Sequence, residues 1–306
     1  MSNIRTLTLD QTGVDEGAVL AAVRSAFLEL GAGTAVQPPQ VVTGLPGGGD
    51  SIVYQAVLPQ AGVYALKVSP YLPQSDGPAI VTAWTLLMST STGEPLLLAD
   101  SKALTAERTA ATSALAVDLL APADAKTLAV VGLGPIGRAH VRYARRVRDF
   151  DHVRVYSRGD VGSLDALGAG VTVAASAEEA AAGADVVMLC TSAAEPVVQA
   201  HALPPGTVVT SVSTNAPRAH EIDPAGLAQL DVYCDYRPAA MASAGDFLIA
   251  SEQHGFTVDD IRGDLAGLLS GRDPSPSGER PVFFRSVGLG IEDAAVAAVA
   301  MEGGQR

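Results

Sequence analysis

Residues 127–146 read TLAVVGLGPIGRAHVRYARR, and this stretch decides the fold. An apolar, β-branched run predicts a strand, and the residues after it have the periodicity of an amphipathic helix. Gly132, Gly134 and Gly137 lie between the two with the spacing G-x-G-x-x-G. Three such glycines alone are weak evidence. A triplet that directly follows a strand and opens a helix is typical of a dinucleotide-binding βα unit.

Each glycine has its own task in such a unit. Gly132 allows the tight turn, Gly134 lets the backbone approach a pyrophosphate, and Gly137 lets the helix pack closely on the strand. The beginning of the helix, at Pro135 and Ile136, favours a phosphate because unpaired N–H groups and the helix dipole meet there. We expect these five residues to bind a dinucleotide, and an ordinary βα turn is the alternative.

Strands and helices alternate from residue 123 onward. We expect strands at 127–131, 153–156, 171–174, 185–191 and 207–212, and helices at 136–148, 177–182 and 258–270. This alternation predicts an α/β fold with a Rossmann-type, doubly wound parallel sheet, which we assign to residues 123–289.

The end of the strand at 153–156 bears on the choice of cofactor. An NAD site usually has Asp or Glu there, which accepts a hydrogen bond from the ribose 2′-hydroxyl. This chain has Ser157 and Arg158 instead, and an arginine suits a 2′-phosphate. The sequence therefore predicts NADP, with NAD as the alternative because Asp160 follows closely.

The first third of the chain, residues 1–122, predicts a mixed α+β domain. We expect a helix at 15–30, strands at 52–57, 63–68, 80–88 and 95–99, and a helix at 106–120 with Thr105 as its N-cap. A last, Ala-rich helix at about 291–301 lies in the segment 290–306, which we assign to the same domain.

Composition excludes several classes of function. The net charge of −13 argues against a nucleic-acid binder and against docking on anionic membranes. The chain lacks an apolar stretch of the ~20 residues that a membrane helix needs. The five histidines and two cysteines lack metal-ligand spacing, so we expect no metal site. Since the N-terminus has no apolar signal-like stretch, the expected compartment is the cytoplasm.

Several segments, in order along the chain, resemble the ornithine cyclodeaminase and mu-crystallin family. They are YALKVSPYLP, STGEPLLLADSKALTAERTAATSALAVDLLAP, CTSAAEPVV, SVSTNAPRAHEID and RSVGLGIEDAA. The block LTAERTAA is more specific than the glycine triplet. The resemblance implies that the first domain binds the substrate and forms a homodimer, and that a cleft between the domains holds Arg108 and Thr109.

The resemblance also implies roles for individual residues. Lys67 and Arg108 match residues that face the substrate carboxylate, and Thr109 matches one that reaches the cofactor phosphates. The other residues assigned to the cofactor are Thr191, Ser192, Ser213, Ser286 and Gly288. Lys67 lies in an apolar strand, where a lysine is costly unless paired or functional; an edge-strand lysine that reaches solvent is the alternative. Arg108 opposes the helix dipole if it lies in the first turn, so we expect an anion beside it.

Two positions depart from the family pattern. Asn215 stands where cyclodeaminases have an aspartate that handles protons, and an amide cannot be a general base. It can still orient an imine or a water, or it only forms a turn. Gln40 follows Pro38-Pro39 where the family often has an arginine. We assign Gln40 and Trp84 to the substrate site, and core packing is the alternative role of Trp84.

These observations favour a reductase or dehydrogenase that moves a hydride to or from the C–N carbon of a small imino or amino acid. Lys67, Arg108 and Asn215 are the expected catalytic residues. Two alternatives stay open. One is an ammonia lyase that uses bound NAD, against which Asn215 speaks, and the other is a non-catalytic protein that binds NADPH and a small ligand.

Overall fold

The computed structural model describes residues 5–7, 14–77, 79–213 and 218–303. The chain divides into two compact units. Unit 1 comprises residues 1–108 and 289–306, and unit 2 comprises residues 109–288. Within the described residues, no helix has both the length and the apolar character required to cross a membrane.

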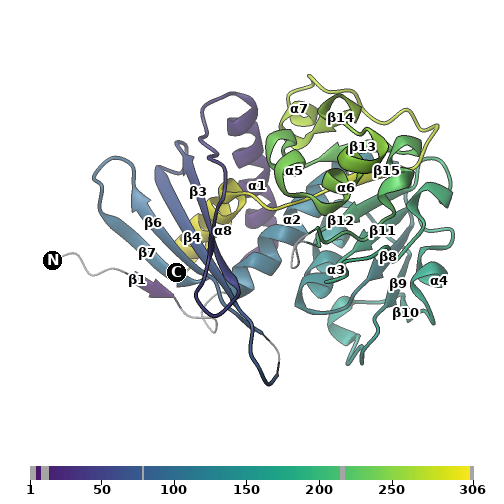
Figure 1. The fold of residues 1–306 in the computed structure, drawn as a ribbon, viewed down its shortest axis with the longest axis horizontal. Coiled ribbons are helices and arrows are strands. Elements are labelled where there is room, and N and C mark those ends of the chain that lie inside the picture. The colour runs from purple at the N-terminus through teal and green to yellow at the C-terminus, as the bar shows by residue number, and fades with distance from the viewer. Residues whose placement is uncertain (1–4, 8–13, 78, 214–217, 304–306) are drawn as a thin grey trace. The chain divides into compact units, whose positions relative to one another are not determined.

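Unit 2 contains a parallel sheet (Figure 1). Its strand order is β10-β9-β8-β11-β12-β15-β13-β14, and all these pairings are parallel. The strands are β8 (Thr127–Val131), β9 (His152–Tyr156), β10 (Val171–Val173), β11 (Val186–Leu189), β12 (Val208–Ser211), β13 (Asp231–Cys234), β14 (Ile261–Asp264) and β15 (Val282–Arg285). The predicted α/β fold with a doubly wound parallel sheet is confirmed.

The order of the strands places a topological switch beside β8. The chain runs outward from β8 to β9 and β10, then returns to add β11 and β12 on the other side. Ligands of such sheets bind outside the carboxyl ends of the strands at this switch. The glycine turn directly follows β8 and is therefore in the expected place for a dinucleotide.

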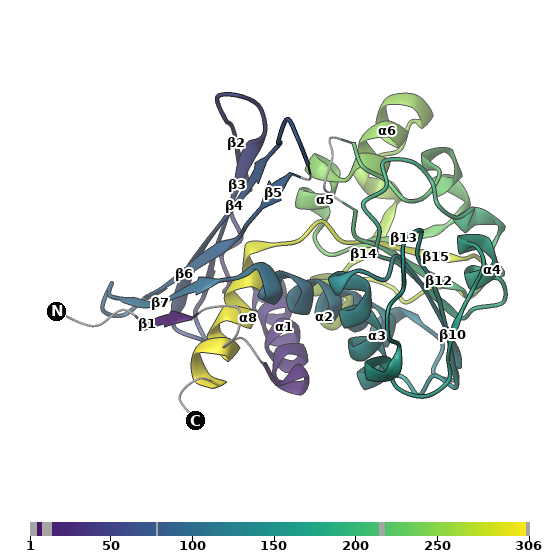
Figure 2. The same cartoon turned by 90° about the horizontal axis from the view of Figure 1, so that it is seen from below.

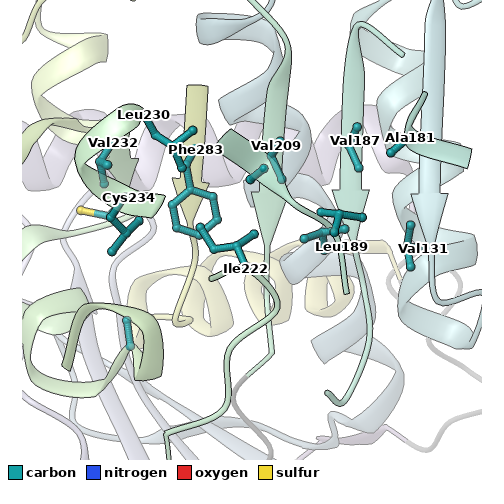
Figure 3. Packing of buried hydrophobic residues seen from close by; sticks show 14 of the residues in the cluster. Val131, Ala181, Val187, Leu189, Val209, Ile222, Leu230, Val232, Cys234 and Phe283 are labelled. Carbon is teal, nitrogen blue, oxygen red and sulfur yellow. The ribbon is translucent and has the colours of Figure 1, made fainter. Parts of the chain in front are cut away.

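Helices and apolar side chains cover the sheet of unit 2. The helices are α3 (Pro135–Val147), α4 (Ala177–Ala181), α5 (Arg237–Ser243), α6 (Gly245–His254) and α7 (Leu265–Leu269), with 3-10 turns η2 (Asp165–Leu167), η3 (Ala200–Ala202), η4 (Pro224–Gln229) and η5 (Val258–Asp260). Figure 3 shows Val131, Leu189, Val209 and Phe283, on neighbouring strands, packed in one buried cluster. Burial of such side chains is the main stabilising contribution to the unit.

The predicted helix at 258–270 is wrong. Strand β14 occupies the middle of that segment and pairs with β13 in parallel. The side chain of Asp264 accepts a hydrogen bond from the Gly267 backbone N–H at 2.9 Å and so begins the short helix α7 only after the strand. The pairing with β13 is a long-range contact, which local periodicity does not reveal.

Unit 1 contains a largely antiparallel sheet with the order β1-β7-β6-β4-β3-β2. Its strands are β1 (Arg5–Leu7), β2 (Val41–Gly44), β3 (Asp50–Leu58), β4 (Val63–Leu72), β5 (Ile80–Val81), β6 (Trp84–Ser89) and β7 (Pro95–Asp100). β5 pairs with β4 beyond this path. The predicted strand at 80–88 is divided between β5 and β6, and β1 and β2 were not predicted.

Helix α8 (Gly290–Gly303) covers one face of this sheet, and helix α1 (Glu16–Gly31) packs against α8 (Figure 2). Asp15 caps α1 by accepting from the Ala18 N–H at 2.7 Å. α8 is rich in alanine and buried over nearly its whole length, as expected of a helix that is apolar all round. Its small side chains let it pack against β3, β4 and α1.

The helix α2 (Lys102–Leu120) begins earlier than the sequence predicts. Thr105 lies inside the helix rather than at its N-cap, and its hydroxyl donates to the Ser101 carbonyl at 2.9 Å. Arg108 consequently lies beyond the first turn. Arg108 therefore does not oppose the helix dipole, and the prediction of an anion beside it on that ground is wrong.

Candidate functional site

The glycine turn after β8 is built by backbone contacts that exclude side chains. Gly132 has φ +93, a left-handed conformation, and a Cβ there would lie 2.6 Å from the Cys190 carbonyl oxygen. A Cβ on Gly137 would lie 1.9 Å from the Gly132 carbonyl oxygen. Both positions therefore require glycine, and the turn brings the start of α3 against the ends of β8 and β11.

Gly134 has a different environment in the same turn. It is the N-cap of α3, its φ is −70, and no atom of the described residues lies within 4 Å of where its Cβ would be. Gly134 and Pro135 are exposed, and Ile136 is half-buried. The helix begins without a side-chain cap. Among the described residues, no side chain caps its first N–H groups, as a pyrophosphate site requires.

The loop after β9 carries the residues predicted to select the cofactor. Ser157 is half-buried and Arg158 is exposed. The carboxylate of Asp160 accepts a hydrogen bond from the Gly162 N–H at 2.9 Å, within the loop itself. Arg138, from α3, donates to the carbonyls of Ser163 and Val161 and so ties the loop to the nucleotide-binding helix.

A buried glutamate, Glu221, organises the ends of β11 and β12. One of its oxygens accepts from the N–H and the hydroxyl of Thr191, at 2.8 and 2.7 Å. The other accepts from the hydroxyl of Ser211 at 2.8 Å and from the N–H groups of Val212 and Ser213 at 3.0 and 3.1 Å. The structure thus brings Thr191 and Ser213 together at the carboxyl edge of the sheet. Glu221 was not predicted from the sequence, although an acidic residue in the segment AHEID could have pointed to it.

A second buried carboxylate, Asp235, fixes the segment after β15. It accepts from the hydroxyl of Ser286 at 3.2 Å and from the N–H groups of Val287 and Gly288 at 2.6 and 3.0 Å. Burial raises the pKa of this carboxyl, and the backbone hydrogen bonds act in the opposite direction. Asp235 therefore holds Ser286 and Gly288 in a fixed conformation at the same edge of the sheet.

The fully buried Arg285 contacts the chain at Ser213 and at Ala219. It pairs with Asp246 at 3.1 Å and donates to the carbonyls of Ser213 and Ala219, at 2.6 and 3.3 Å. Asn215 itself lies outside the described residues. Ser192 is exposed just beyond β11, and Thr109 is buried in α2.

Unit 1 contains a buried group of four charged side chains, Lys67, Arg108, Glu292 and Asp293, which we call the charge quartet. Lys67 on β4 donates to Asp293 Oδ1 at 3.0 Å. Arg108 on α2 donates from Nε to the same oxygen at 3.2 Å and from Nη1 to Glu292 at 3.1 Å. Two cations therefore share one carboxylate oxygen. The quartet has two positive and two negative groups, so its members offset much of one another's charge.

The fold brings these four residues together from three elements. Glu292 and Asp293 lie in the first turn of α8, where the helix dipole favours acidic side chains. Lys67 lies on the sheet face that α8 covers, on a central strand, so the edge-strand alternative is wrong. Arg108 is only 7% exposed and is not a surface residue of a charged helix. The partners are thus anions of the protein itself.

Burial acts on the pKa values of Lys67, Arg108 and the neighbouring Tyr54, whose ring lies 5.1 Å from Lys67 Nζ. Burial lowers the pKa of Lys67 to about 8, although Asp293 acts to raise it. Burial opposes the charge of Arg108, but Asp293 and Glu292 keep its pKa above the usual range. Burial raises the pKa of Tyr54 to about 12. Lys67 is therefore the group of the three that can exchange a proton near neutral pH.

Lys67 and Arg108 have more N–H donors than their hydrogen bonds within the quartet use. An arginine has five N–H groups and a lysine three, whereas the hydrogen bonds above use one N–H on Lys67, one on Nε and one on Nη1 of Arg108. The half-buried Tyr54 adjoins Lys67 on the same sheet face. Two adjacent cations of this kind can hold a carboxylate with charge-assisted hydrogen bonds.

Two residues assigned to the substrate do not join the quartet. Trp84 is paired with Val68, one position from Lys67 on β4, so its side chain points to the opposite sheet face. Gln40 directly precedes β2, and no hydrogen bond or ion pair of the described residues links it to Lys67 or Arg108. Sequence reasoning missed Glu292 and Asp293, although the adjacent acids opening an apolar helix were visible in GIEDAA.

Known proteins resemble this chain over almost its full length. The NAD(P)H-dependent anabolic L-arginine dehydrogenase DauB of Pseudomonas aeruginosa is 52% identical over 284 residues, which are 91% of this chain and 90% of that protein. The structure of the Thermococcus litoralis Δ1-pyrroline-2-carboxylate reductase with NADH and L-proline has a TM-score of 0.90 at 27% identity. That match covers 98% of this chain and 97% of the reductase.

An archaeal alanine dehydrogenase dimer with bound NAD is similar as well. Its TM-score is 0.88 at 25% identity, over 98% of this chain and 95% of that one. The sequence profile of the ornithine cyclodeaminase/mu-crystallin family matches residues 10–304. This chain therefore belongs to the ornithine cyclodeaminase/mu-crystallin family.

Proposed function

We propose that the chain is a nicotinamide-dependent oxidoreductase that interconverts an α-amino acid and its α-imino acid by hydride transfer. The observation that carries this proposal is the pair of buried cations, Lys67 and Arg108, that share one oxygen of Asp293. Such a pair suits a carboxylate, and Lys67 can also exchange a proton. The relatives described above are, by their names, a reductase and dehydrogenases of imino or amino acids.

The residues of unit 2 fit a dinucleotide. The open backbone at Gly134 and the uncapped start of α3 suit the pyrophosphate. Thr109, Thr191, Ser192, Ser213, Ser286 and Gly288 stay the proposed cofactor contacts, together with the glycine turn. When bound, the nicotinamide supplies or accepts the hydride. Arg158 and Ser157 at the end of β9 support a preference for NADP, because no carboxylate stands at the strand end itself.

The residues of unit 1 orient the substrate and move a proton. Arg108 and Lys67 hold the carboxylate, which fixes the adjacent carbon for the transfer. In oxidation the Cα–H bond breaks and its electron pair leaves as hydride, while Lys67 Nζ accepts one proton from the ammonium group. In reduction the imine carbon accepts the hydride and Lys67 returns that proton to the amine nitrogen. Asn215 remains a proposed orienting group.

The substrate we propose is an amino acid with a cationic side chain. The proposal rests on the 52% identity to a protein named as an L-arginine dehydrogenase. Wild-type protein with L-arginine and NADP+ should form the reduced nicotinamide, followed by its absorbance, and the 2-oxo acid with ammonium should consume NADPH. Ammonia release without net cofactor change would support a lyase instead. NADPH binding without turnover of any amino or imino acid would contradict the proposal.

The rate should depend on pH through Lys67. Its pKa of about 8 means that Lys67 is protonated below that pH and neutral above it. Because oxidation needs a proton acceptor and reduction a donor, kcat/KM for oxidation should rise, and for reduction fall, as pH increases through about 8. The Lys67→Arg variant, whose side chain stays charged, should lose this dependence of kcat/KM on pH near 8. An unchanged profile in that variant would assign the proton transfer to another group.

We also propose a homodimer formed through the sheet face opposite Lys67. Val68 and Trp84 lie side by side there and are 40% and 41% exposed. Leu66 and Leu86 pair beside them and are half-buried. Exposed apolar patches of this kind are typical of interfaces, and one relative was solved as a dimer. The cytoplasmic location stays a prediction.

A further inference from the structure

The sheet face that carries Lys67 extends along β3 to an acidic residue, Asp50. The register pairs Tyr54 with Lys67 and Asp50 with Tyr71, and β3 and β4 run between these pairs without a shift. Side chains of a strand alternate between its faces, so Asp50, Ile52 and Tyr54 point to the same side. The carboxylate of Asp50 is therefore on the same face as the ammonium group of Lys67.

Helix α8 does not cover this end of the face. The helix begins at Gly290, where a Cβ would lie 2.2 Å from the Gln55 carbonyl oxygen. From there it covers the far end of β3, where Ala56 and Leu58 are buried. Asp50 and Ile52, which lie before this level, are only half-buried. Helix α8 thus covers the sheet face on one side of Lys67, and the side chains on the other side, toward Asp50, are less buried.

The side chain of Asp50 makes no hydrogen bond or ion pair with the residues that the structure describes, while its backbone pairs with Gly44 and Tyr71. The preceding Gly49 has φ +81, and a Cβ there would lie 2.2 Å from the Tyr71 carbonyl oxygen, so the backbone at the start of β3 is closely fitted. Burial is the main cause of the raised pKa of Tyr54, and the charge of Asp50 adds to it. A half-buried carboxylate so placed favours a cation.

The separation of Asp50 from Lys67 suits one class of ligand. Four residues of strand separate the level of Asp50 from that of Lys67, which is about 13 Å at the usual rise. In an extended arginine, five bonds of about 1.5 Å each separate the α-carbon from the guanidinium carbon and span about 6 Å. A charge-assisted hydrogen bond of about 2.8 Å at each end accounts for most of the rest. A shorter side chain would not span the gap.

We infer that Asp50 is the residue that selects a cationic substrate side chain, by pairing with the guanidinium or ammonium group of an amino acid whose carboxylate is held by Lys67 and Arg108. The inference rests on the proposed function and assigns its specificity. A planar guanidinium bonds a carboxylate with two parallel hydrogen bonds, whereas an ammonium group makes single contacts. L-arginine is therefore preferred over L-lysine, and both over neutral amino acids of similar length.

The test compares wild-type protein, Asp50→Asn and Asp50→Glu with L-arginine, L-lysine and L-norleucine. Asp50→Asn should raise the KM for L-arginine by about 10- to 100-fold, with kcat changed little, because a hydrogen bond to a charged group is lost. Its KM for L-norleucine should not rise. Asp50→Glu should restore much of the preference for L-arginine. Glu94→Gln, in the exposed turn between β6 and β7, removes one negative charge elsewhere and should leave all three KM values unchanged.

Calorimetric binding of L-arginine and L-norleucine, with NADP+ present, separates this inference from the proposed function. Tighter binding of L-arginine to wild-type protein that Asp50→Asn abolishes supports the role of Asp50, even if no amino acid is oxidised and the proposed function fails. The role is overturned if Asp50→Asn keeps the preference for L-arginine, if it weakens L-arginine and L-norleucine equally, or if wild-type protein binds neither.

Discussion

Replacing Arg108 by alanine is expected to lower kcat/KM for a carboxylate substrate by roughly 10²- to 10³-fold, since losing one partner of a buried, hydrogen-bonded charge pair has effects of this order. The loss should be mainly in KM, because Arg108 holds the substrate carboxylate before and during hydride transfer. Steady-state kinetics with L-arginine checks this. Affinity for NADPH, which the residues of unit 2 are proposed to provide, should change little.

The same substitution also affects folding, and a paired variant separates the two effects. Without Arg108, Glu292 loses a partner and Asp293 retains Lys67. Breaking a buried ion pair by removing one partner costs about 3–5 kcal/mol of stability. Arg108→Met combined with Glu292→Gln removes both charges and should recover much of the melting temperature without recovering kcat/KM. If this double variant regained activity along with stability, Arg108 would be a structural residue only.

The second large effect is expected at the glycine turn, where two alanine substitutions should act in different ways. Gly134→Ala should leave the fold intact, because its Cβ meets nothing in the described residues and its φ suits any residue. The added methyl group would occupy the space that a pyrophosphate needs, so the Kd for NADPH should rise by about 10- to 100-fold. Calorimetric titration with NADPH and NADH measures this effect.

Gly137→Ala is the matched comparison. Its Cβ would lie 1.9 Å from the Gly132 carbonyl oxygen, so α3 must move away from β8. Such overpacking should lower the melting temperature by roughly 5–10 °C. Nucleotide affinity should fall as a consequence. Equal thermal destabilisation by both substitutions, with equal nucleotide affinity, would show that Gly134 serves only the packing of the turn.

The parts of the fold that depend on local order were predictable. The strand β8, the glycine turn and the helix α3 form one continuous segment, so their residue types and spacing already contain the constraint. The family resemblance rests on short segments of the same kind. Lys67 and Arg108 could be singled out because a lysine in an apolar strand and the LTAERTAA block are local features. Their partners could not be identified in that way.

The parts that depend on distant residues needed the tertiary structure. Lys67 and Asp293 are 226 positions apart, and only the packing of α8 on β4 makes them an ion pair. The same holds for Glu221, which joins the ends of two strands, and for the pairing that made residues 261–264 a strand instead of a helix. The strand register placed Trp84 and Lys67 on opposite faces. Sequence alone thus determined which residues are unusual. The partners of the buried charges were determined only by the tertiary structure. A buried charge must be paired because desolvation is costly, and the packing of distant elements decides which opposite charge lies beside it.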